Sequence, residues 1–96
     1  MIGPSNKVTK KVYEDIERAL LNASNARTKA AAKPYLDLAK YYHHTIRHDL
    51  DDYVEEQLSS AIIYADDASG RVDEKERKID NVKHFLYKFK GQITLE

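Results

Sequence analysis

Apolar residues recur at helical spacing along three stretches of the chain. The first stretch has intervals of four and three residues, at Val8, Val12, Ile16, Leu20 and Ala23. This spacing places the apolar side chains on one face of an α-helix. Ser5 or Asn6 can cap the start of this helix. Pro34 is expected to close it, because the residue before a proline avoids helical geometry.

A second apolar stripe begins after Pro34, which is also a good first residue for a helix. It meets neither Gly nor Pro before Gly70, and its members are Leu38, Tyr42, Ile46, Leu50, Tyr53, Val54, Leu58, Ala61, Ile62 and Ala65. Read as one helix over residues 34–69, it would be about 54 Å long at ~1.5 Å per residue. The alternative is a break near residues 48–52. Asp52 and Glu55 have capping-box spacing, which can start a new helix there.

The third stretch is a heptad seam, with intervals of seven, three, four, three and four residues at Val72, Ile79, Val82, Leu86, Phe89 and Ile93. Such a narrow stripe is typical of helix-to-helix packing. Asp73 and Glu76 have the spacing of a helix start, and Gly91 is expected to end the helix. Residues 1–5 and 91–96 are expected to be loosely ordered. Leu95 and Glu96 are left out of the fold prediction, because a vector-derived remnant would end in this way.

Length and composition favour one helical domain. The chain has 96 residues, 42% of them hydrophobic, with only 3 Gly and 2 Pro. That is enough apolar material for a core, but too few turn residues for a small all-β domain. We therefore predict an all-α protein without a sheet, folded as a single domain over residues 1–96. It is an antiparallel bundle of three long helices, or of four if the middle helix breaks near residues 48–52.

Several functional classes have no support in the sequence. The chain contains no Cys, which excludes disulfides, thiolate metal sites and cysteine nucleophiles. It has no G-x-S-x-G elbow and no glycine cluster that could cradle a phosphate. We therefore expect no enzyme, no cofactor and no small-molecule substrate. No apolar run approaches the ~18–20 residues of a membrane span. The N-terminus lacks the apolar segment of a secretory signal, so a cytoplasmic location is expected.

Charge is unevenly distributed although the net charge is zero. Residues 1–48 hold nine Lys/Arg and four Asp/Glu, and residues 49–96 hold seven and twelve. Complementary faces on antiparallel helices explain this asymmetry. If the termini lie together, a basic patch results from Lys7, Lys10, Lys11, Lys83, Lys88 and Lys90. That patch would suit a nucleic-acid accessory protein. The neutral total instead favours an ordinary lysine-rich surface, so nucleic acid is not the expected partner.

The histidines suggest an alternative function. His43, His44 and His48 are followed closely by Asp51 and Asp52. On a continuous helix, positions 44, 48 and 52 share a face, and two imidazoles with a carboxylate can hold Zn²⁺. A metal-binding bundle that uses His44, His48 and Asp52 is therefore one hypothesis. Histidines on a helix surface beside acidic residues are the other interpretation, and a break at residues 48–52 favours it.

The main expectation is a protein that works through contact with another protein or with itself. A continuous middle helix would leave the stripe of Tyr53, Leu58 and Ile62 uncovered, and exposed apolar stripes mark interfaces. A two-fold dimer would cover it. A chain broken near Asp52 would instead cover its own stripe as a four-helix monomer. In size and helix order the chain resembles the small immunity proteins that protect bacteria from their own bacteriocins. The likeness is one of architecture, and no motif residue carries over.

Overall fold

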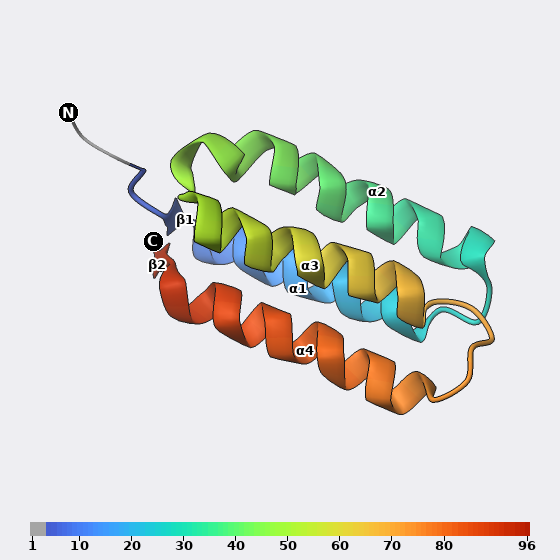
Figure 1. Ribbon diagram of the computed structural model, residues 1–96. Helices are drawn as coiled ribbons and strands as arrows, with labels where there is room; N and C mark the ends of the chain where they lie inside the picture. The colour runs from blue at the N-terminus through green and yellow to red at the C-terminus, as the bar shows by residue number, and fades with distance from the viewer. Residues whose placement is uncertain (1–3) are drawn as a thin grey trace.

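The computed structural model describes residues 4–96, which form four antiparallel helices (Figure 1). These are α1 (Lys10–Asn25), α2 (Lys29–Ile46), α3 (Asp52–Ala68) and α4 (Lys75–Gln92). Helices α1 and α3 lie in the middle and each contacts all of the other helices. Helices α2 and α4 flank them on opposite sides, in a bundle of 47 × 22 × 18 Å. The predicted all-α class is confirmed.

The apolar stripe of the middle region is divided between two helices. Helix α2 ends at Ile46, a 3₁₀ turn (η1) covers Arg47–Asp49, and Leu50 is extended. The next helix is capped by Asp51 rather than Asp52, because Asp51 Oδ1 accepts a hydrogen bond of 2.9 Å from the Val54 N–H. The continuous helix over residues 34–69 is therefore wrong. The break near residues 48–52 is confirmed, and it gives the four-helix version of the bundle.

The boundary between the first two helices differs from the predicted one. Residues Lys7–Val8 form a short strand (β1), so Thr9 caps α1 in place of Ser5 or Asn6. Helix α1 ends at Asn25, well before Pro34, and Thr28 caps α2 by accepting a 3.0 Å hydrogen bond from the Ala31 N–H. Pro34 lies inside α2. A proline there removes one backbone hydrogen bond, but the alanines and straight-chain residues around it favour helix strongly.

The last helix keeps the predicted seam but not the predicted ends. Val82, Leu86 and Phe89 are buried, and Ile79 and Ile93 are partly buried. The residue that precedes α4 is Glu74, in the left-handed region with φ 55°, and no side chain caps the helix. Asp73 is therefore not the cap. Gly91 lies within the helix, which continues to Gln92.

The chain ends are joined by a small sheet, which corrects the prediction of a fold without a sheet. Thr94–Leu95 (β2) pairs in parallel with β1, and Lys7 lies opposite Thr94. Residues 91 and 92 belong to α4 and residues 94 and 95 to β2, and the loose order expected for residues 91–96 stays a prediction. Pro4 and Ser5 are exposed and outside any helix or strand, and the remainder of that expectation, residues 1–3, lies outside the described part of the chain.

Asn6 ties three segments together beside this sheet. Its side chain donates to Asp51 Oδ2 at 3.1 Å and accepts from the Asp51 N–H at 2.9 Å. Its backbone N–H donates to the Asp49 carbonyl, and its own carbonyl accepts from the Thr94 N–H. Asn6 also has φ 54°, a conformation that asparagine tolerates better than most residues. One residue therefore links the N-terminal strand, the C-terminal strand and the break between α2 and α3.

Asn6→Ala is expected to lower the free energy of unfolding by about 1–2 kcal/mol, since it removes two side-chain hydrogen bonds and strains the backbone. Asn6→Gly is the matched control, because it loses the same hydrogen bonds but adopts positive φ without strain. Urea unfolding followed by circular dichroism measures both. A smaller loss for Gly than for Ala is expected. Two unchanged midpoints would show that Asn6 does not hold the ends.

A lysine closes the opposite end of the bundle. Lys75 Nζ donates to the carbonyls of Ala26, Ala68 and Gly70 at 3.1, 2.7 and 2.8 Å. The Gly70 N–H also donates to the Ala26 carbonyl at 2.9 Å. Burial, with a smaller contribution from Lys29, lowers the pKa of Lys75 below its usual value. The three carbonyls stabilise the charged ammonium there. Through these hydrogen bonds, Lys75 joins the α1–α2 turn to the α3–α4 loop.

Within residues 4–96, no helix is long and apolar enough to cross a membrane.

The core lies between the two central helices and their neighbours. The largest of its fully buried side chains are Phe89, Ile16, Leu20, Leu58, Val54 and Val82. The Phe89 ring stacks on Tyr13, with ring centroids 6.2 Å apart.

Candidate functional site

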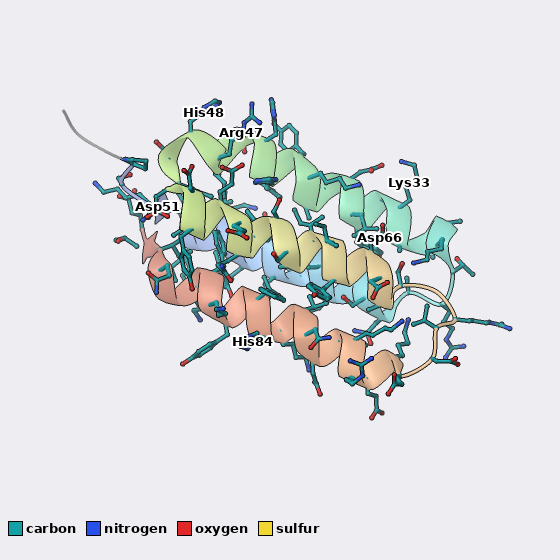
Figure 2. All side chains as sticks on the ribbon, viewed as in Figure 1. Lys33, Arg47, His48, Asp51, Asp66 and His84 are labelled. Atoms are coloured by element: carbon teal, nitrogen blue, oxygen red, sulfur yellow. The ribbon has the colours of Figure 1, made fainter. Side chains whose placement is uncertain are left out.

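The residues of the predicted metal site lie on three separate segments. His44 is on α2, His48 is in the 3₁₀ turn and Asp52 begins α3, and all three are exposed. Figure 2 shows His48 at the outer side of the turn that follows α2, pointing away from the bundle. Within the described residues, no group of three or more His, Asp or Glu side chains could hold a metal ion. The shared helix face required for this site ends where α2 ends.

His43 points toward α3. Its Nε2 lies 3.4 Å from Glu55 Oε1, and its side chain is 20% exposed. This contact crosses between two helices of the bundle, so His43 is part of the packing between α2 and α3.

The predicted interface stripe is largely in the core. Leu58 is 0% and Ile62 is 6% exposed, whereas Tyr53 is 49% exposed. Because the chain turns back at the break, its own helices cover Leu58 and Ile62. These two residues therefore cannot form a contact surface while the fold is intact, and the reason for a dimer through this stripe is removed.

The fold brings some lysines of the predicted basic patch together at one end of the bundle, but not all of them. The pairing of β1 with β2 places the start of α1 near the end of α4, and Lys10 and Lys90 line one groove of about 540 Å³. The same groove is lined by Glu14 and Glu17, and Lys10 Nζ lies 3.9 Å from Glu14 Oε1. Lys83 lines a different groove with Glu76 and Asp80. Acidic residues therefore interrupt the predicted basic patch.

The lysines of these clusters also have close neighbours. Lys7 Nζ lies 3.6 Å from Glu96 Oε1, and Lys11 Nζ lies 2.9 Å from Asp15 Oδ2. Lys88 and Lys90 lie over the rings of Phe85 and Tyr13, at 5.8 and 5.5 Å from the ring centroids. Carboxylates therefore balance the charges of Lys7 and Lys11, whereas the rings beside Lys88 and Lys90 attract the ammonium groups without neutralising them. This arrangement fits a lysine-rich solvent surface better than a phosphate-binding surface.

Helix α2 has an unusual distribution of large and small side chains. Its buried residues are Ala32, Leu36 and Ala39, two of which are alanines. Three of its large apolar residues are exposed instead, with Tyr35 at 39%, Leu38 at 42% and Tyr41 at 62%. A helix on the surface of a bundle normally places its large apolar residues against the core. Helix α2 thus carries a second apolar face that the bundle does not cover.

This second face is a continuous uncharged stripe along α2. We call it the α2 outer stripe, and its members are Ala31, Pro34, Tyr35, Leu38, Tyr41, Tyr42 and Thr45. Tyr42 is partly buried and the other six are exposed. Positions 31, 38 and 45 are seven apart, as are 34 and 41, and 35 and 42. At 100° per residue these positions share one side of the helix, in the repeat used for helix-to-helix packing.

Charged residues follow the stripe along one edge, and α1 borders the other. The charged edge consists of Lys33, Asp37 and Lys40, with His44 next to them, and all four residues are exposed. Lys33 Nζ donates to Asp37 Oδ2 at 2.8 Å, and this bond holds the pKa of Asp37 below its usual value. A polar rim beside an apolar strip is the usual composition of a protein-binding surface.

At the other edge, Tyr42 anchors the stripe to α1. Its hydroxyl donates to Asp15 Oδ2 at 2.9 Å, and Asp15 also accepts from Lys11 and Arg18 at 2.9 and 3.1 Å. The hydrogen bond from Lys11, followed by that from Tyr42, lowers the pKa of Asp15. Tyr41 packs edge-on against Tyr42, with ring centroids 5.8 Å apart. Because Tyr42 is bonded to α1, the ring of Tyr41 that packs against it has a fixed neighbour on one side.

The remaining exposed large apolar residues are distributed over other elements. They are Tyr53, Ile63 and Tyr64 on α3, Tyr87 on α4 and Leu95 in β2. The ring of Tyr64 stacks on Phe85 at 5.0 Å, so it packs within the bundle. Tyr87, at 78% exposed, is the most exposed of the group. The α2 outer stripe therefore has the densest grouping of large apolar side chains on one exposed helix face.

Sequence periodicity does not reveal this stripe, because Leu38, Tyr42 and Ile46 step by four and count as members of one apolar stripe. Tyr42 and Ile46 are partly buried, but Leu38 is on the outside. The signal that was present is the absence of charge at seven related positions from Ala31 to Thr45. No protein-family model, curated protein or solved structure matches the chain.

Proposed function

We propose that the protein acts in the cytoplasm, without catalysis, by binding another protein chain through the α2 outer stripe. The observation that carries this proposal is the placement of side chains on α2, where small residues face the core and large apolar residues face solvent. Alanines face the core at positions 32 and 39, whereas Leu38 and Tyr41 are exposed at 42% and 62%. Folding alone gives no reason for this choice, because large apolar side chains stabilise a protein by burial.

The chemistry of the stripe supports a protein partner. Tyrosine is enriched at the centres of protein interfaces, since its ring buries a large apolar area and its hydroxyl tolerates water. The stripe presents Tyr35 and Tyr41 on either side of Leu38. A heptad-spaced strip on an exposed helix fits the apolar face of a second helix. Its side chains include no catalytic acid, base or metal ligand apart from weakly acidic phenols.

The experiment that tests this function places a photo-cross-linking phenylalanine analogue at position 41, in the cells that make the protein. Tyr87 on α4 is the matched control, because it is also an exposed tyrosine but lies outside the stripe. Cross-links to one defined protein band from position 41, with little from position 87, are expected. Equal yields from both positions, or none from position 41, would contradict the proposal.

A further inference from the structure

We propose that the occupant of the α2 outer stripe is a second copy of this chain. The two α2 helices pack antiparallel about a two-fold axis that passes beside Leu38. This inference rests on the proposed function, because it identifies the partner of the same surface. Two features of the stripe support it: the tyrosines placed evenly about Leu38 and the flanking charges.

The stripe reads nearly the same in both directions. A two-fold axis beside Leu38 pairs residues whose numbers sum to 76, so that Tyr35 faces Tyr41 of the second copy. The same operation pairs Ala31 with Thr45, two small residues, and Pro34 with Tyr42. Leu38 meets its own copy at the axis. In an isologous interface each such contact occurs twice, once on either side of the axis, so this register forms two Tyr35–Tyr41 contacts around the central pair of leucines.

The charged edge is also compatible with the two-fold axis. The axis places the charged edge of one copy beside the same edge of the other. Asp37 then lies within one residue of Lys40 of the second copy, and Lys40 lies equally close to Asp37 of the second copy. The pairing thus offers two opposite-charge contacts across the interface. Such flanking pairs are the feature that fixes orientation in paired helices.

The size of the stripe sets the expected affinity. Helix α2 has 18 residues and is therefore about 27 Å long. One face of such a helix is smaller than the ~800 Å² per partner of a stable interface. We therefore expect a weak, reversible dimer with a dissociation constant of about 10 µM to 1 mM.

Sedimentation equilibrium over this concentration range tests the occupant. The wild-type mass is expected to rise from 11.1 kDa toward twice that value. Leu38→Glu sets two carboxylates against each other at the axis, and it is expected to weaken association at least tenfold. Tyr87→Glu is the control and is expected to leave association unchanged. A wild-type protein that stays monomeric throughout, or equal effects of both variants, would overturn the dimer.

Charge reversal at the exposed edge tests the orientation of the pair. Asp37→Lys creates repulsion with Lys40 of the second copy and is expected to weaken the dimer. The double variant Asp37→Lys/Lys40→Asp restores opposite charges and is expected to recover association. A double variant as weak as the single one would contradict the antiparallel pairing.

Engineered cysteines test the register directly, because the chain has no cysteine of its own. An oxidised mixture of the single variants Ala31→Cys and Thr45→Cys is expected to form mainly the mixed disulfide. Disulfides mainly between identical variants would instead indicate parallel pairing and overturn the proposal. If the protein is monomeric but position 41 still cross-links to a different protein, the second copy is the wrong occupant and the proposed function stands. If position 41 cross-links to nothing, the proposed function fails as well.

Discussion

Leu36→Ala is expected to lower the free energy of unfolding by about 2–5 kcal/mol, the range for a buried leucine. Leu38→Ala, two residues further along the same helix, is expected to change it by about 0.5 kcal/mol or less. The difference follows from placement, because Leu36 is 6% and Leu38 is 42% exposed. Truncation of Leu36 leaves a cavity, whereas truncation of Leu38 removes contacts mainly with water.

Chemical unfolding of both variants at low protein concentration measures this difference, since self-association would otherwise add apparent stability to the wild type. The substitutions are identical in chemistry and share a helix, so intrinsic helix propensity cancels between them. A larger loss for Leu38 than for Leu36 would mean that α2 is rotated and that Leu38 faces the core. That result would remove the α2 outer stripe.

Leu86→Ala is also expected to cost about 2–5 kcal/mol of unfolding free energy. Leu86 is 3% exposed, between Val82 and Phe89 on the seam of α4. For a domain with a total stability of about 5–15 kcal/mol, such a loss is a large fraction of the whole. Thermal and urea unfolding should both show it.

Tyr87→Ala is the control for this substitution, since Tyr87 is the next residue on α4 and is 78% exposed. It is expected to alter stability by about 0.5 kcal/mol or less. Equal small effects at positions 86 and 87 would mean that the heptad seam does not face the core, in conflict with the packing of α4.

The sequence predicts the helical class and the α4 seam well, because both depend on periodicity over many residues. Val82, Leu86 and Phe89 recur at heptad spacing, and all three are buried. The break in the middle region was one of two alternatives. Its signal was local and weak: an acidic pair at capping-box spacing inside an unbroken apolar stripe. The break depends on tertiary contacts, since Asn6, near the N-terminus, forms hydrogen bonds with Asp51 at the start of α3.

The placement of Pro34 and the chain ends was beyond local rules. A proline usually ends a helix, but Thr28 begins α2 six residues earlier and the helix continues through Pro34. The strand pairing of Val8 with Leu95 joins residues far apart in sequence, and two residues carry too little pattern to predict it. These features depend on long-range contacts.

The candidate surface was missed for a different reason. Periodicity groups Leu38 with Tyr42 and Ile46 in one apolar stripe and predicts that they share one side of the helix. It cannot tell which of two apolar faces a helix buries when alanines fill one of them. The shared helix face on which the metal hypothesis depends is interrupted at the helix break, because His44 and Asp52 share a face only on a continuous helix. Both differences arise from tertiary structure, which local periodicity does not contain.

The α2 outer stripe exists only if Leu36 faces the core and Leu38 faces solvent, and relaxation of leucine methyl NMR signals by a soluble gadolinium complex tests this orientation of α2. At low micromolar concentration, the Leu38 methyls are expected to be strongly broadened and the Leu36 methyls to be protected. At millimolar concentration, the second copy should partly protect Leu38 while Leu36 is unchanged. Leu38 methyls as protected as those of Leu36 in the dilute protein would contradict the account, because the α2 outer stripe would then be part of the core.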